Sequence, residues 1–153
     1  MGVSTDGIIC FGVHVGEELP EAMDGLGGDE EEWWLSHNSY NPPFEMFTED
    51  GDWIGGKKWS DEKVSEYYDH RRAWLKQNPI PFEMINCCSD DCPDWIIAVH
   101  GASVWCHRGY PKEIRKHTVS EEGHEDAIKM LKAFLEEIGC DGELKWWLAS
   151  YWG

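Results

Sequence analysis

The sequence predicts an α+β fold: a mixed or largely antiparallel sheet of about four to five strands, with two main helices packed on one face. Three observations predict it. Apolar, β-branched and aromatic runs typical of strands occur near both ends and in the centre of the chain. Two further segments carry apolar residues at helical spacing. The 153 residues are enough to bury a core, and we expect a single domain, 1–153, with an acidic loop or flap at 16–56.

The longest apolar run, PDWIIAVHGASVWCHRGYP at 93–111, is the predicted centre of the sheet. Residues 95–99 are apolar at every position, which is typical of a strand buried on both faces. Gly101 separates them from a second run at 102–107, and glycine accepts the backbone angles of a tight turn or a bulge. We therefore expect an antiparallel hairpin here. Further extended segments are expected at 7–15, 82–94 and 144–151, and a turn at 50–51.

Local signals mark the two predicted helices. Ser60 can accept hydrogen bonds from the first backbone N–H groups of a helix over 60–77, and the acidic residues that follow suit the positive end of the helix dipole. Thr118 and Glu121 have the spacing of a capping box, which predicts a second helix that runs to Ile138. The glycine after Ile138 suits the end of that helix.

Negative charge is concentrated in the N-terminal third of the chain. The net charge is −17, and residues 1–56 contain thirteen Asp and Glu but no Lys or Arg. A field of one sign attracts cationic partners and repels nucleic acid and anionic membrane surfaces. We therefore expect a protein partner with a basic surface, including one that itself binds nucleic acid, and no direct binding to nucleic acid or membranes. The acidic candidates for this contact are Glu17, Glu18, Glu21, Asp24, Asp29, Glu30, Glu31 and Glu32.

The acidic segment at 16–32 has two interpretations. It is a solvated face that keeps a tryptophan-rich protein soluble, or it is a docking surface for a basic cleft. Mimicry of a DNA backbone would need carboxylates on rigid elements, and three glycines among the acids argue against that version. Arg108 and Tyr110 are a second candidate contact pair, although a β-turn with Tyr110 packed on the core is the simpler interpretation.

The six cysteines are the basis of an alternative function. Zinc takes four nitrogen or sulfur ligands in a tetrahedron. Cysteines and histidines in the second half of the chain are candidates for such a set: Cys87, Cys88 and Cys92 with His100, Cys106 or His107. A paired Cys-x₂-Cys motif is absent, so we expect no metal and no cofactor. P-loop, GxSxG, HExxH and dinucleotide motifs are absent too, so we expect no enzyme; a small metal-binding or enzymatic protein built on these residues is the alternative.

The N-terminus shows no basic-then-apolar leader, and no apolar run approaches the roughly 20 residues of a membrane span, so we expect a cytoplasmic protein with reduced thiols. Three segments, MGVSTDGI at 1–8, HRGYPK at 107–112 and WLASYWG at 147–153, resemble a family of small acidic accessory proteins encoded by bacteriophages and prophages. The resemblance brings no catalytic residues. It implies a protein made in an infected or lysogenic bacterium that binds and inhibits a host protein, such as a CRISPR or restriction component. A structural role in the virion is a third hypothesis.

Overall fold

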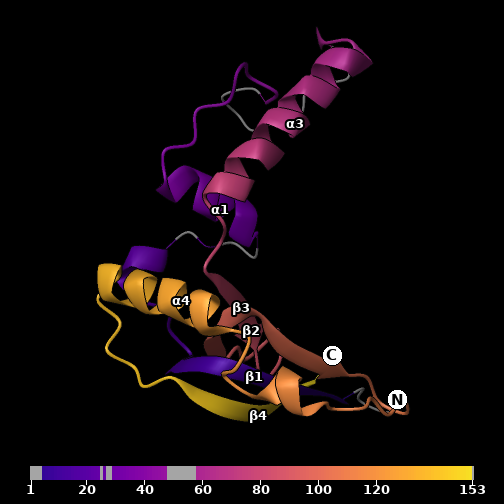
Figure 1. Cartoon of the computed structure of the whole chain (residues 1–153), viewed down its shortest axis with the longest axis vertical. Helices are drawn as coiled ribbons and strands as arrows, with labels where there is room; N and C mark the ends of the chain where they lie inside the picture. Colours follow the sequence, from indigo (N-terminus) through magenta and orange to yellow (C-terminus); the bar gives the residue numbers. More distant parts are fainter. Residues whose placement is uncertain (1–4, 25, 27–28, 48–57, 153) are drawn as a thin grey trace. The chain divides into compact units, whose positions relative to one another are not determined.

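A computed structural model of the chain describes residues 5–24, 26, 29–47 and 58–152 (Figure 1). The chain divides into two compact units. The larger comprises Met1–Glu30 and Pro81–Gly153, and the smaller comprises Glu31–Ile80. The turn expected at 50–51 lies outside the described residues. Among the residues that are described, no helix has both the length and the apolar character needed to cross a membrane.

The larger unit is built on one antiparallel sheet of four strands in the order β2-β3-β1-β4. The four strands are β1 (Thr5–Gly16), β2 (Phe82–Asn86), β3 (Trp95–Cys106) and β4 (Lys145–Trp152). Helix α4 (Glu125–Glu137) lies over one face of this sheet (Figure 1). The α+β class and the antiparallel sheet predicted from the sequence are therefore confirmed.

The predicted hairpin at Gly101 is wrong, because β3 is one continuous strand. Both halves of β3 pair with β1: Ser103 pairs with Cys10, and Ala98 pairs with Gly12. The residues of β3 between these two pairs form a bulge, in which Gly101 has a φ of 76°. A left-handed residue within a bulge bends a strand without reversing it. The apolar run therefore continues along a single partner strand.

The second helix begins later than the capping-box pattern predicts. Thr118 lies in a short 3-10 helix, η2 (Lys116–Val119), and α4 starts only at Glu125. The backbone at Gly123 has a φ of 90°, which a right-handed helix cannot contain. The start at Thr118 is therefore wrong, whereas the predicted end is confirmed: Ile138 caps α4, and the next residue, Gly139, has a φ of 69°.

One face of the sheet packs against α4. Leu131 and Phe134 of the helix are buried, and the ring of Phe134 stacks on that of Phe82 in β2, with 4.8 Å between the ring centroids. The opposite face carries a second buried cluster: Ile8, Cys10, Ile85, Ile96 and Ala98. The backbone N–H of Trp152 in β4 donates to the carbonyl of Cys88, just beyond β2, at 2.8 Å. Since β3 and β1 lie between these two strands, the sheet curls around the second cluster.

The smaller unit contains most of α1 (Glu30–His37) and all of α3 (Asp61–Gln77). The hydroxyl of Ser60 accepts a hydrogen bond from the N–H of Lys63, as the predicted cap requires. The indole N–H of Trp34 donates to the carbonyl of Asn78 at 2.9 Å and ties α1 to the end of α3. The segment at 16–56, predicted as an acidic loop or flap, thus contains two helices, α1 and the short η1 (Glu21–Met23).

Candidate functional site

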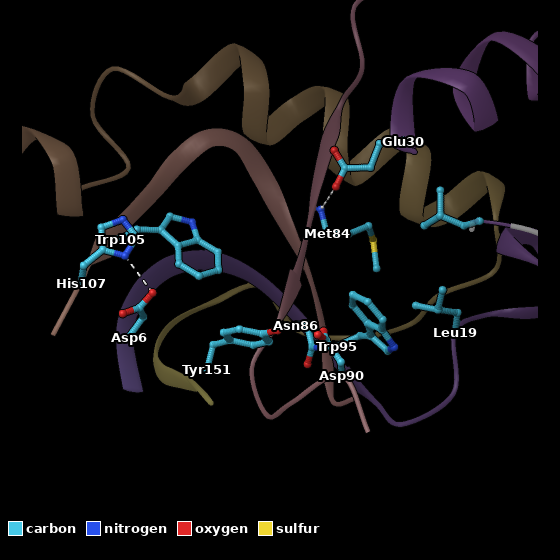
Figure 2. A pocket seen from close by; sticks show the side chains of 11 residues that line it. Asp6, Leu19, Glu30, Met84, Asn86, Asp90, Trp95, Trp105, His107 and Tyr151 are labelled. Carbon is cyan, nitrogen blue, oxygen red and sulfur yellow. Dashed lines mark hydrogen bonds and ion pairs between the residues drawn. The ribbon is translucent and has the colours of Figure 1, made fainter. Parts of the chain in front are cut away.

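Two adjoining hollows in the larger unit, of about 370 Å³ and 580 Å³, share the side chains of Leu19, Leu26 and Trp95. We call the two together the acidic groove. Its floor is largely apolar: Leu19, Met23, Leu26, Met84, Trp95, Trp105 and Tyr151. Figure 2 labels Leu19, Met84 and the three aromatic residues. Its carboxylates are those of Asp6, Glu17, Glu18, Glu21, Asp24, Glu30 and Asp90. The sheet supplies the aromatic floor, and the segment after β1 supplies most of the acids.

The electrostatic field in the acidic groove is negative. Neither hollow has a Lys or Arg among the described residues that line it. His107 is the one histidine in that lining, and its Nδ1 lies 2.8 Å from Oδ2 of Asp6, within hydrogen-bond distance. That hydrogen bond holds the pKa of Asp6 below its usual value. Asp6 is therefore ionised near neutral pH, and the groove favours a cation.

Glu30 has a structural role at the end of the groove. It accepts a hydrogen bond from the backbone N–H of Met84 at 2.8 Å (Figure 2). Met84 belongs to β2, which is the outermost strand on its side of the sheet. Burial raises the pKa of Glu30, while the hydrogen bond from Met84 opposes that rise. The carboxylate therefore pays a desolvation penalty in order to occupy this position.

Replacing Glu30 by glutamine tests this description. The amide oxygen still accepts from Met84, and the neutral side chain avoids the desolvation of a charge. Folding raises the pKa of the Glu30 carboxyl above its usual value of 4.5, so the folded state favours the protonated form. Glu30 therefore stabilises the fold most at pH values below 4.5, and this stabilisation is lost as pH rises through the folded-state pKa. E30Q is therefore expected to gain stability relative to the wild type as pH rises from acidic to neutral. Urea unfolding across that range measures the difference, and a relative loss with rising pH would contradict it.

The structure divides the eight acidic candidates into different environments. Glu17, Glu18, Glu21 and Asp24 are exposed at the groove, and Asp29 is exposed outside its lining. Glu31 and Glu32 belong to the smaller unit, where both hold Arg71, at 2.5 Å from its Nε and 2.6 Å from its Nη1, respectively. The side chain of Arg71 is only 12% exposed. These two carboxylates are therefore engaged by a largely buried arginine, although their own side chains are 44% and 52% exposed.

A turn forms over residues 107–110, one residue earlier than the predicted turn at 108–111, and Tyr110 does not pack on the core. Its backbone N–H donates to the carbonyl of His107 at 3.0 Å, and Gly109 has a φ of 81°. The Tyr110 side chain is 77% exposed, so the interpretation of a packed ring is wrong. The backbone N–H of Arg108 donates to Asp6 at 3.3 Å, which connects the turn to the end of the groove.

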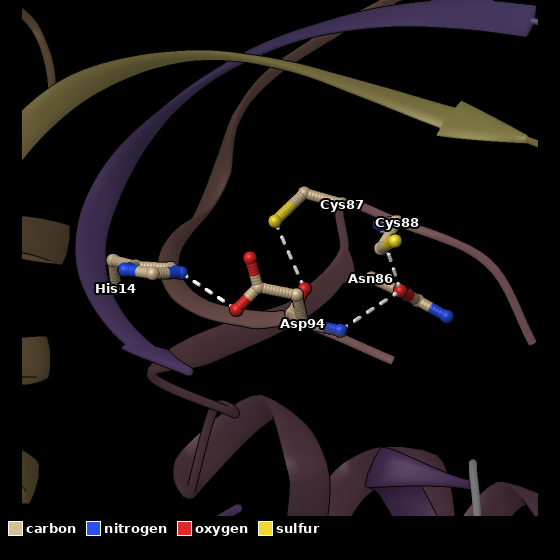
Figure 3. Close-up of polar contacts among 5 residues, drawn as sticks. All are labelled: His14, Asn86, Cys87, Cys88 and Asp94. Atoms are coloured by element: carbon tan, nitrogen blue, oxygen red, sulfur yellow. Dashed lines mark hydrogen bonds and ion pairs between the residues drawn. The ribbon is translucent and has the colours of Figure 1, made fainter. Parts of the chain in front are cut away.

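A cluster of possible metal ligands lies elsewhere in the larger unit (Figure 3). Among the described residues, His14, Cys87 and Asp94 are the one group of three or more whose ligand atoms all lie within 4.8 Å of one another. Cys87 was a predicted candidate, but its partners are not the predicted His100, Cys106 or His107. In the sequence, His14 lies four residues after Cys10 and so falls on the same face of the predicted strand. That spacing could have placed a histidine next to the sheet core, but it could not have identified Cys87 and Asp94 as its neighbours.

The Cys87 thiol is not an activated nucleophile. Burial and the neighbouring Asp94 carboxylate raise its pKa to about 11. Nucleophilic cysteines react as thiolates and lie in surroundings that lower the pKa. The hydrogen bond between Nε2 of His14 and Oδ1 of Asp94, at 2.7 Å, also directs that imidazole nitrogen to the carboxylate and not to the sulfur. The cluster therefore does not support thiol catalysis.

Comparison of the chain with protein-family models, with curated proteins and with solved structures finds no match.

Proposed function

We propose that the chain is a non-enzymatic binding protein whose acidic groove takes a basic segment of a partner protein. The main support for the proposal is that the two hollows of the groove share an apolar floor, formed by Leu19, Leu26 and Trp95. Carboxylates line both hollows around this floor. This arrangement is more specific than an acidic face that serves only solubility, because it combines charge with a hollow of defined lining.

A lysine or arginine side chain fits the chemistry of the acidic groove. Each has an apolar stem that packs on apolar surface and a charged head that stays near water or a carboxylate. Trp95 and Trp105 line the groove, and the faces of aromatic rings attract cations. Acidic side chains such as Glu17 and Glu21 would form charge-assisted hydrogen bonds with the head groups. The charge of the groove would also accelerate association with a basic protein.

The proposed setting is the cytoplasm of an infected or lysogenic bacterium, where the protein binds and inhibits a host protein. The support is the resemblance of the segments at 1–8, 107–112 and 147–153 to phage and prophage accessory proteins. A host enzyme that handles nucleic acid presents the kind of basic cleft that a negative groove recognises. CRISPR and restriction components belong to this class of target. In this proposal Arg108 and Tyr110 add contacts beyond the end of the groove.

Charge reversal at the groove tests the proposal. We expect the quadruple variant E17K/E18K/E21K/D24K to lose a partner that the wild type captures from bacterial lysate. The four lysines would repel a basic partner that the four carboxylates attract. All four residues are exposed, so we expect the fold to be retained. Capture by the wild type should also weaken at high salt, since salt screens exposed charges. Quantitative mass spectrometry measures the captured protein, which should be basic.

A matched control separates the groove from overall charge. The variant E121K/E122K/E136K/D141K makes the same change in net charge at exposed positions outside the groove lining, and it should keep the partner. Equal loss in both variants would show that only net charge matters and would contradict docking in the groove. Reversal of Glu30, Glu31 and Glu32 is a poor test, because it breaks internal contacts with Met84 and Arg71.

A further inference from the structure

The sheet brings three different ligand types to one point in the larger unit. His14 projects from β1, Cys87 directly follows β2, and Asp94 directly precedes β3. The backbone N–H of Cys87 donates to the carbonyl of Asp94 at 2.8 Å, which continues the pairing of β2 and β3 by one more bond. His14 pairs with Ile96 in the neighbouring ladder. The backbone of the sheet and of the residues next to it therefore brings these three positions together.

Hydrogen bonds orient the side chains within this cluster (Figure 3). Nε2 of His14 lies 2.7 Å from Oδ1 of Asp94, and the Cys87 thiol donates to the Asp94 carbonyl at 2.9 Å. The amide oxygen of Asn86 accepts from the backbone N–H groups of Cys88 and Asp94, at 3.1 Å and 3.4 Å. The first two bonds join the ligand residues to one another, whereas Asn86 holds the backbone behind them, as supporting residues do at metal sites in proteins.

We propose that His14, Cys87 and Asp94 bind a zinc ion, with a fourth coordination position open to solvent. Zinc lies about 2.0–2.3 Å from nitrogen, oxygen and sulfur ligands, so the ligands of a tetrahedral site are roughly 3.3–3.8 Å apart. The three ligand atoms here lie within 4.8 Å of one another. The separations would therefore have to change by about 1.5 Å or less, and the pair formed by His14 Nε2 and Asp94 Oδ1, now 2.7 Å apart, would have to widen to reach the geometry that zinc requires.

The ligand types favour zinc over the common hard cations. Magnesium and calcium take oxygen ligands, whereas a thiolate with an imidazole suits zinc. On binding, the Cys87 S–H bond breaks, a Zn–S bond forms, and the proton leaves to the buffer. The side chains of His14 and Asp94 are 38% and 37% exposed, which gives the ion a path of entry and leaves room for water in the fourth position. Three protein ligands and one water are the pattern of catalytic zinc sites.

Cobalt substitution tests the site directly. We expect metal-free protein to bind one equivalent of Co²⁺, with a thiolate-to-cobalt charge-transfer band and the intense visible bands of tetrahedral cobalt, and one equivalent of Zn²⁺ to displace it. C87S should abolish the charge-transfer band. D94N, at a partly exposed position, should weaken zinc binding by about 100-fold or more, measured against a chromophoric chelator. Circular dichroism checks that both variants are folded.

C92S is the matched control, because Cys92 lies in the same turn but outside the cluster. It should keep both the cobalt spectrum and the zinc affinity of the wild type. Absence of a thiolate band in the wild type would overturn the proposal. A band that survives C87S, or that C92S removes, would overturn the assignment of the ligands. None of these outcomes depends on whether the acidic groove binds a partner.

Discussion

Replacing Gly12 by alanine is expected to destabilise the larger unit by about 3 kcal/mol or more, at the upper end of the cost of overpacking. A Cβ atom at this position would lie 2.3 Å from the carbonyl oxygen of Ile97 and 2.6 Å from Cα of Ala98. Both atoms belong to the backbone of β3, so no side chain can rotate away. Relief requires β1 and β3 to separate, and β1 holds β3 on one side and β4 on the other. Urea unfolding followed by circular dichroism measures the loss.

The control for this prediction lies in the same strand. A Cβ atom at Gly7 would meet its nearest atom, the carbonyl oxygen of Cys106, at 3.9 Å, which is ordinary van der Waals contact. The φ angle of Gly7 is not positive, so alanine can adopt the same backbone conformation. G7A is therefore expected to stay within about 1 kcal/mol of the wild type. If the two variants unfold at the same urea concentration, the close approach of β1 and β3 at Gly12 is wrong.

Replacing Phe82 by alanine is expected to destabilise the larger unit by about 3–5 kcal/mol, as is usual when a phenyl ring is removed from a core. Phe82 is fully buried, and its ring stacks on Phe134 at an interplanar angle of 17°. The substitution leaves a cavity between β2 and α4, whose backbones cannot both collapse into it. A loss this large is a sizeable part of the stability of a small domain. The urea midpoint should fall far below that of the wild type.

A double-mutant cycle shows whether the two rings stabilise each other. F82A, F134A and the double variant together give the coupling energy, which should be about 0.5–1.5 kcal/mol for a direct aromatic pair. Y110A is a suitable reference for an aromatic ring outside the core, because its ring is 77% exposed and its loss should cost little. A small effect of F82A, comparable to that of Y110A, would contradict the packing of α4 on the sheet.

Elements with strong local signals could be predicted from the sequence. The helix over 60–77 was predicted from a capping serine and helical spacing, and α3 has those bounds within one residue. The strand at 7–15 was predicted from two apolar faces, and it matches the interior of β1. Gly101 shows where local reasoning ends. A hairpin and a bulge both accept a glycine with positive φ, and only the pairing of both halves of β3 with β1 distinguishes them.

The candidate sites depend on contacts that spacing does not encode. His14 and Asp94 are 80 positions apart, and no motif connects them. Charge density predicted the acidic segment, but it did not separate Glu17, at the groove, from Glu32, which holds Arg71. The aromatic floor of the groove depends on the curl of the sheet, which brings Trp95 and Tyr151 to the same hollow. Such arrangements follow from tertiary packing and not from local propensity.

The hydrogen bond between Glu30 and Met84 also bears on self-association. An outer strand with free backbone N–H groups is a template on which a strand of another molecule can add and begin aggregation. β2 is such a strand, and Glu30 occupies one of its donors with a negatively charged side chain. An incoming strand would have to displace the carboxylate and approach its charge. The same residue that borders the groove thus protects the sheet from growing by one strand.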